Sequence, residues 1–197
     1  MSDHDSAAGP AKPAASSATP DDLFRRLDAL GIPYRTHRHA AVFTVEEAKA
    51  LRGALPGAHC KSLFLRDKKG AAYLVVCLED RPLDMKALAG VIGSGRLSFG
   101  SAERLRERLG VEPGSVTPFA ALNEDSSADK IMIVLDSEMM AADPVNYHPL
   151  VNTATTALAP DGLLRFLAST GHAARIVDLA PATRTREPAD AARDGLR

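Results

Sequence analysis

The sequence is poor in cysteine, and its two cysteines do not form a recognisable pattern. Cys60 and Cys77 lack a CxxC spacing, which disfavours both a zinc site and a disulfide framework. No apolar stretch is long enough for a membrane-spanning helix, and the N-terminus has no basic-then-apolar signal pattern. We therefore expect a reduced, intracellular protein without a membrane partner.

An excess of charge of either sign is also missing. The chain has 24 Lys and Arg residues against 25 Asp and Glu residues, a formal net charge of −1. Such a balance produces no overall positive field that would attract a polyanion. It counts modestly against a nucleic-acid partner.

Several catalytic signatures are absent as well. There is no GxSxG motif, which disfavours a serine hydrolase of that type. The GSGR stretch at 93–96 is not followed by a long helix, so it is a weak candidate for a phosphate loop. The i, i+4 spacing of an HExxH zinc motif does not occur among the histidines at positions 37, 39, 59, 148 and 172. The sequence thus predicts no standard nucleophile, no metal and no cofactor.

What is present is the composition of a globular protein of one domain. The chain has 197 residues, of which 45% are hydrophobic and 25% charged, both ordinary values. Residues 1–18 are rich in Ala, Ser and Pro, and residues 181–197 are similarly poor in large apolar side chains. Such segments bury too little surface to offset their ordering entropy. We expect a disordered tail at 1–18, a domain at 19–180 and a flexible tail at 181–197.

Helix signals recur along this domain. Each is a capping residue followed by an apolar periodicity and closed by glycine or by a final apolar residue. The capping box Thr44-Val45-Glu46-Glu47 predicts the start of one of these helices. The first expected helix has Thr19 as its N-cap and Pro20 in its first position, and it ends at Gly31. The others run from Thr44 to Leu51, from Asp84 to Gly90 and from Ser101 to Gly110, and a last helix covers DGLLRFLASTG.

Strand signals alternate with these helices. The stretch KSLFLRDKKGAAYLVVCL contains two apolar runs around a turn at residues 67–70, which predicts an antiparallel hairpin with Lys61 at its head. KIMIVLD contains an uninterrupted apolar run from Ile131 to Leu135, as in a strand at the centre of a sheet. ARIVDL is expected to form the last strand. The pattern predicts an α/β fold with a mixed sheet.

Four stretches, taken in order, carry a resemblance to a known family. They are PYRTHRHAAVFTVEEA, KSLFLRDKKGAAYLVV, GRLSFGSAERLRERLGVEPGSVTPFA and HPLVNTATTAL. Over about residues 21–179 the chain resembles the YbaK-like aminoacyl-tRNA deacylases. Within that family it is similar to the free-standing prolyl-tRNA editing proteins of the ProX type (ProXp-ala-like), which are related to the editing insertion domain of bacterial prolyl-tRNA synthetase.

The resemblance implies a fold, an activity and a set of partners. The fold is a mixed, largely antiparallel, barrel-like sheet flanked by helices in one domain. The activity is that of a cytoplasmic hydrolase that removes a mischarged amino acid, alanine above all, from the acceptor end of proline tRNA, with no cofactor. The protein is expected to be a monomer. Delivery of the tRNA by prolyl-tRNA synthetase or an elongation factor is a further expectation.

The resemblance also implies roles for particular residues. Lys61 is expected to hold the phosphate or ribose of the terminal adenosine. The loop from Gly114 to Pro118 is expected to present backbone N–H groups to the aminoacyl ester, and His148 to shape the aminoacyl pocket. The substrate-binding residues are Phe43, Thr44, Val45, Ser62, Pro118, Asn152 and Thr153, with Phe43 and Val45 as an apolar wall. Ser62 departs from the family pattern, because relatives usually have asparagine there.

Each residue also has a structural interpretation. A lysine at the head of an apolar strand is often a solvated edge charge, and His148 before a proline is typical of a turn histidine. GSVTP is a common turn, and Phe43 would by default be core. The threonines after Asn152 favour a strand, although they would also suit a polar floor for a small aminoacyl-ribose.

Two further points stay open from the sequence. The charged helix at 101–110 is either a solvated face or, with Arg66, Lys68 and Lys69, a patch for tRNA phosphates. The substrate could be cysteinyl-tRNA or seryl-tRNA in place of alanyl-tRNA, because of Ser62. A catalytically idle module that binds aminoacyl-tRNA or a protein is the remaining alternative.

Overall fold

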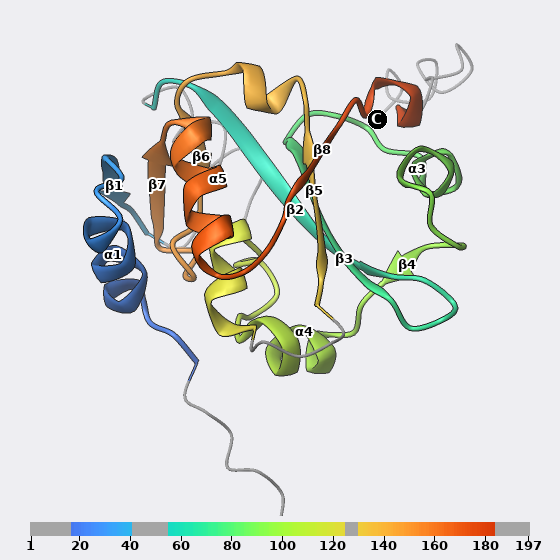
Figure 1. The fold of residues 1–197 in the computed structure, drawn as a ribbon, viewed down its shortest axis with the longest axis horizontal. Helices are drawn as coiled ribbons and strands as arrows, with labels where there is room; N and C mark the ends of the chain where they lie inside the picture. Colours follow the sequence, from blue (N-terminus) through green and yellow to red (C-terminus); the bar gives the residue numbers. More distant parts are fainter. Residues whose placement is uncertain (1–16, 41–54, 125–129, 184–197) are drawn as a thin grey trace, which may run out of the picture.

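The computed structural model describes residues 17–40, 55–124 and 130–183. The described residues form an eight-stranded mixed sheet in the order β1-β7-β6-β2-β3-β5-β8, with β4 paired to β2. Helices lie on both sides of the central strands (Figure 1). The expected α/β domain with a mixed, mainly antiparallel sheet flanked by helices is confirmed. Within the described ranges no helix is both long and apolar enough to cross a membrane.

The sheet combines hairpins with parallel crossovers. Its strands are β1 (Tyr34–Arg38), β2 (Ala58–Arg66), β3 (Ala72–Leu78), β4 (Ser98–Phe99), β5 (Met132–Asp136), β6 (Val145–Tyr147), β7 (Ala154–Leu158) and β8 (Arg175–Val177). The predicted hairpin is β2–β3, which pairs antiparallel from Cys60 opposite Leu78 to Arg66 opposite Ala72. Strands β3, β5 and β8 run parallel, as do β2 and β6.

The α-helices begin and end where capping chemistry allows. They are α1 (Pro20–Ala29), α3 (Met85–Ile92), α4 (Ala102–Leu109) and α5 (Pro160–Ser169). Short 3-10 turns are η1 (Pro118–Asn123), η2 (Met139–Ala141) and η3 (Ala180–Ala182). The Thr19 and Ser101 side chains accept from Asp22 N and Arg104 N, so both predicted N-caps are confirmed.

Two predicted boundaries are wrong. The helix capped by Asp84 continues past Gly90 to Ile92, and Gly93 closes it in a left-handed conformation. The exposed Gly90 is tolerated because buried Ile92 anchors the extra turn. Strand β2 begins at Ala58, so Lys61 is its fourth residue and not its head. The capping box at Thr44 and its helix lie outside the described residues.

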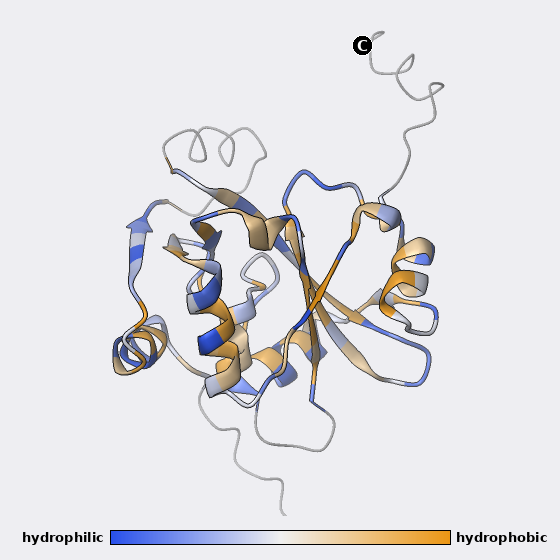
Figure 2. Ribbon diagram, turned by 45° about the horizontal axis from the view of Figure 1, so that its top comes forward, coloured by the Kyte–Doolittle hydropathy of each residue, from blue (hydrophilic) through white to orange (hydrophobic). Residues whose placement is uncertain are grey.

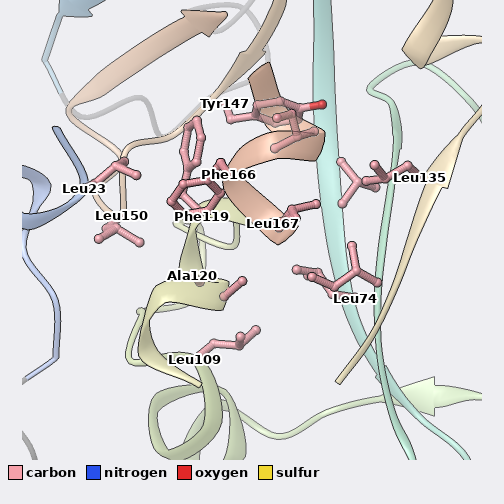
Figure 3. Packing of buried hydrophobic residues seen from close by; sticks show 14 of the residues in the cluster. Leu23, Leu74, Leu109, Phe119, Ala120, Leu135, Tyr147, Leu150, Phe166 and Leu167 are labelled. Carbon is pink, nitrogen blue, oxygen red and sulfur yellow. The ribbon is translucent and has the colours of Figure 1, made fainter. Parts of the chain in front are cut away.

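The central strands are largely hydrophobic (Figure 2), and their buried residues belong to two core clusters. On β3, Leu74 and Val76 pack with helices α1, α4 and α5, while Val75 and Cys77 pack with α3 and η3. This double burial explains why the strand reads as a continuous apolar run. In the larger cluster, the Phe119 ring meets Phe166 and Tyr147 edge-on, with centroids 5.3 and 5.8 Å apart (Figure 3).

Candidate functional site

His148 lies directly after β6, and a backbone carbonyl fixes its ring. Its Nδ1 is 2.9 Å from the Ala154 carbonyl oxygen. Because a carbonyl only accepts, Nδ1 carries a hydrogen. Nε2 of the neutral ring is therefore a hydrogen-bond acceptor, and the side chain is only half buried. The fold thus presents one imidazole nitrogen that can receive a proton or a hydrogen bond from a ligand.

The turn after His148 is held in a strained conformation. Leu150 has φ of 67° although it is not glycine, a state that costs on the order of 1–3 kcal/mol. Its side chain is buried in the larger core cluster, which offsets this cost. The turn then exposes Thr153 and half-exposes Asn152 before β7 begins. Strain concentrated between His148 and Asn152 is typical of a loop shaped for a ligand.

The threonine run forms β7, as the strand interpretation predicts. Thr156 is fully buried, and its hydroxyl lies 2.8 Å from that of Thr36 on β1. Thr155 bonds through its hydroxyl to the ring of His39 at 3.0 Å. The two hydroxyls therefore brace strands and side chains of the protein, and the polar floor expected for a ligand does not include Thr156.

Lys61 lies on an inner strand of the sheet, opposite Cys77 of β3. Strand β2 has β3 as one neighbour and β6 as another. The half-buried Lys61 ammonium donates to the Arg81 carbonyl. The Arg81 side chain is itself fixed, because its Nε lies 2.8 Å from the buried carboxylate of Asp136. The ammonium is therefore held at a defined position beside the segment that follows β3.

The sheet register brings Lys61 and His148 to neighbouring strands. Strands β2 and β6 run parallel, with His59 opposite Asn146. Lys61 and His148 each lie two residues beyond that pair along their own strand or its continuation. By this register two residues that are 87 positions apart in the sequence lie at the same level of the sheet, Lys61 in the first half of β2 and His148 just beyond the end of β6.

The Gly114–Pro118 loop is tied to the same region through the aromatic core. Phe119 directly follows Pro118, and its ring packs against Tyr147, the residue before His148. Gly114 has φ of 89°, and no atom lies within 4 Å of where a Cβ would be. In the described part of the chain, the N–H groups of Val116 and Thr117 donate to no backbone oxygen. A positive φ at an open glycine beside such N–H groups is compatible with an anion-binding turn.

The remaining predicted residues divide into two groups. Ser62 lies on β2 and is half-buried, and Pro118 is buried at the start of η1. Phe43, Thr44 and Val45 lie outside the described residues, and the predicted apolar wall stays a prediction.

His39 is a site residue that sequence reasoning did not select. It follows β1, and its ring centroid is 6.4 Å from that of His148 at an interplanar angle of 53°. Only the pairing of β1 with β7, with His37 opposite Thr155, places it there. The one sequence signal is its position at the start of the segment HAAVFT that carries the predicted pocket wall.

The cysteines beside this region are not nucleophiles. Burial raises the pKa of Cys60 to about 12 and that of Cys77 to about 11. Both thiols are therefore protonated at neutral pH, and a thiol is a weak nucleophile compared with a thiolate. Among the described residues, no three His, Cys, Asp or Glu side chains group as metal ligands.

Basic side chains gather at a separate hollow between the β2–β3 hairpin and α4. Its volume is about 230 Å³. Phe64 forms part of its wall, and Gly100 gives that ring room, since a Cβ there would lie 2.4 Å from it. The lining residues are Phe64, Arg66, Gly70, Ala72, Gly100, Arg104, Glu107 and Arg108.

Comparison with known proteins identifies the family. The model of the aminoacyl-tRNA editing domain matches residues 39–166. A Bos taurus protein named prolyl-tRNA synthetase associated domain-containing protein 1 is 40% identical over 155 residues, which cover 76% of this chain and 89% of that protein. The prolyl-tRNA editing protein ProX of Acetoanaerobium sticklandii is 35% identical over 158 residues, which cover 80% of this chain and 95% of the relative.

A solved structure agrees with this at the level of the fold. A candidate trans-editing enzyme for prolyl tRNA synthetase superposes with a TM-score of 0.60 at 23% identity, over 86% of this chain and 99% of that one. The family model, which matches well over half of the chain, and the fold that agrees with it define an aminoacyl-tRNA editing domain. The chain belongs to this family, and its full-length relatives include a ProX protein.

Proposed function

We propose that this protein is a trans-editing hydrolase that deacylates mischarged proline tRNA, with alanyl-tRNA(Pro) as its substrate. Membership of the aminoacyl-tRNA editing family carries the proposal. The 35% identity to a protein named as a prolyl-tRNA editing protein supports the choice of tRNA. The deacylation would take place in the cytoplasm.

The proposed chemistry is the attack of water on the aminoacyl ester. The oxygen of water bonds to the acyl carbon, the bond to the ribose 3′ oxygen breaks, and a proton ends on that oxygen. The products are a free amino acid and a tRNA with both terminal ribose hydroxyls. Positioning of water and ester contributes roughly 7–11 kcal/mol at most. The reaction therefore needs no strong nucleophile from the protein.

Each residue has a proposed role in this step. The N–H groups of the Gly114–Pro118 loop stabilise the oxyanion, a contribution of about 3–4 kcal/mol for one well-placed donor. Lys61 holds the terminal adenosine by its phosphate or ribose. The Nε2 acceptor of His148 orients the acyl group or the water, and the free 2′ hydroxyl of the ribose activates that water. Asn152 and Thr153 border the acyl group.

Selectivity for alanine would come from the size of the pocket. A difference of one methyl group in a pocket is worth only about 1–3 kcal/mol. Steric exclusion of proline by Phe43 and Val45 is therefore the simpler means of protecting correctly charged tRNA. Ser62 has a shorter side chain than asparagine, which keeps cysteinyl-tRNA and seryl-tRNA as alternative substrates.

The tRNA body would contact the hollow beside α4. Its guanidinium groups come from Arg66 on β2 and from Arg104 and Arg108 on α4. Arg108 is paired with Glu124, so Arg66 and Arg104, against Glu107, would give this concave surface a local positive field despite the net charge of −1. Binding through so few phosphate contacts is weak and depends on salt. Delivery by prolyl-tRNA synthetase or an elongation factor would compensate for the low affinity.

One panel of substrates tests the proposed function. Purified protein is offered proline tRNA charged with alanine, cysteine, serine or proline, and loss of the acyl group is followed over time. Fast release of alanine with prolyl-tRNA left intact is the expected result. Preference for cysteine or serine would change the substrate, and no hydrolysis of any of the four would favour a binding module over an enzyme.

A further inference from the structure

We infer that His39 is a positioning residue for His148, and this inference rests on the proposed function. Two histidines contact three consecutive residues around the start of β7. Thr153 O accepts from the backbone N–H of His39 at 3.0 Å, Ala154 O accepts from the ring Nδ1 of His148 at 2.9 Å, and the Thr155 hydroxyl lies 3.0 Å from the ring Nε2 of His39. His39 therefore binds the residues on both sides of the carbonyl that orients His148.

The hydrogen-bond partners define the state of the His39 ring. Its Nδ1 lies 2.8 Å from the Ala40 carbonyl oxygen, so Nδ1 carries a hydrogen. Nε2 of the neutral ring then accepts from the Thr155 hydroxyl. Both ring nitrogens are used within the protein, which leaves neither for direct chemistry on an ester. The role of His39 is thus exerted through its neighbour.

The start of β7 needs such support. It follows a turn in which Leu150 adopts a left-handed conformation. Strand β1, which ends just before His39, pairs with β7 alone among the described strands. If the Ala154 carbonyl rotated away, the Nδ1 hydrogen of His148 would lose its acceptor, and the ring could exchange its tautomer. His39 and Thr155 together keep the accepting nitrogen of His148 toward the proposed substrate.

A set of matched variants tests this role. His39→Ala and Thr155→Val remove the hydrogen bond between the two side chains, with valine preserving the shape of threonine. His39→Gln and Thr155→Ser keep a hydrogen-bonding partner at the same position. His37→Ala is the control, because His37 lies on β1 opposite the same threonine but is exposed. Three quantities are measured for each variant: the ¹⁵N shifts of the His148 ring, deacylation of alanyl-tRNA(Pro), and the melting temperature.

We expect the His148 ring of the wild type, of Thr155→Ser and of His37→Ala to show the Nδ1–H tautomer. In His39→Ala and Thr155→Val the shifts should move toward a mixture of tautomers. Their kcat should fall by about tenfold or more, as for other residues that orient a catalytic ligand, with KM unchanged. His39→Gln should retain most of the wild-type kcat. The double variant His39→Ala with Thr155→Val should lose no more kcat than either single variant.

Unchanged His148 shifts in both His39→Ala and Thr155→Val would overturn the inference. Losses of activity that follow the melting temperature, and that appear equally in Thr155→Ser, would also overturn it. The ring shifts do not require turnover. If the wild type hydrolyses no aminoacyl-tRNA, the proposed function fails while the shifts still decide whether His39 positions His148.

Discussion

At the scale of single residues, two glycines with the same φ angle differ in the space around them. Gly57 and Gly70 both have φ of 91°. A Cβ on Gly57 would lie 2.1 Å from the Pro144 carbonyl oxygen, whereas a Cβ on Gly70 would have no atom within 4 Å. Gly57 precedes the strand of Lys61, and Pro144 precedes the strand that leads to His148. These two segments therefore approach closely where strands β2 and β6 begin to pair.

Substitution of both glycines by alanine should separate strain from steric crowding. Gly70→Ala should cost about 1–2 kcal/mol of unfolding free energy, because of the left-handed φ alone. Gly57→Ala should cost about 1–3 kcal/mol more, since backbone atoms must move apart. Urea denaturation of the two variants provides the measurement. Equal reductions for both would show that the approach of Gly57 to Pro144 is not tight.

Some of the site could be predicted from single residues and some could not. Lys61, Gly114 and His148 were selected through ordered motifs, and the fold accounts for each of their local conformations. Ordinary patterns gave no reason to select His39, because its contacts with Thr155 and His148 depend on pairing between strands more than 100 positions apart. The strained backbone of Leu150 also leaves no sign in the sequence, since leucine rarely adopts positive φ.

At the scale of elements, a buried ionic cluster joins α4, η1 and the end of α5. Glu124 follows η1 and is buried. Its carboxylate lies 2.5 Å from Arg108 Nη2 on α4 and 2.5 Å from His172 Nε2. Both of its oxygens also accept from Ile131 N at 2.9 Å. One carboxylate therefore connects three elements that surround the larger core cluster.

This cluster predicts a dependence of stability on pH. Burial by itself would raise the pKa of Glu124, but hydrogen bonds from His172, Ile131 N–H and Arg108 outweigh it and hold the pKa below its ordinary 4.5. A lowered pKa in the folded state means that this stabilisation is complete above pH 4.5. It is lost as the pH falls through the folded value.

Glu124→Gln should therefore lower the unfolding free energy at neutral pH by about 1–3 kcal/mol. It should also reduce the loss of stability below pH 4.5, because the titrating group is gone. Glu112→Gln is the matched control, an exposed carboxylate paired with Arg106 at 2.8 Å. Denaturation curves across the acid range decide the matter. If the unfolding free energy of Glu124→Gln fell as steeply below pH 4.5 as that of the wild type, groups other than Glu124 would cause the acid sensitivity.

Elements with strong local signals were predicted well, among them the three-residue strand β8 within ARIVDL, whereas strands β1 and β6 were not predicted. The caps of α1 and α4 and the β2–β3 hairpin follow from local chemistry. Strand β1 has three exposed residues of five, and β6 has three residues with a buried asparagine at its centre. Neither shows an apolar alternation. The buried Asn146 is explained only by the fold, where its amide nitrogen donates to Pro56 O and Ala58 O.

At the scale of the whole molecule, local charge matters more than net charge. The balanced composition argued against a nucleic-acid partner, yet folding brings Arg66 and Arg104 to one hollow from segments 38 positions apart. Both arginines are exposed. The predicted patch for tRNA phosphates remains a proposal, and the shared hollow supports it.

Removal of these two charges should weaken tRNA binding without changing the chemical step. Arg66→Gln with Arg104→Gln should raise KM for alanyl-tRNA(Pro) and leave kcat unchanged. The slope of log affinity against log salt concentration should become less steep by about two, that is, by about one for each phosphate contact that is lost. Arg26→Gln, an exposed arginine on α1, is the control and should behave as the wild type. An unchanged salt dependence in the double variant would remove the hollow from the tRNA interface.

The most direct test of the account is the single-turnover deacylation of alanyl-tRNA(Pro) with and without the terminal 2′ hydroxyl. A confined pocket that relies on the substrate's own sugar should release alanine quickly from the natural tRNA. Release of alanine from the 2′-deoxy form should be at least about a hundredfold slower, as expected for the loss of a general acid–base catalyst. Equal rates on the two substrates, or no release from either, would contradict the mechanism.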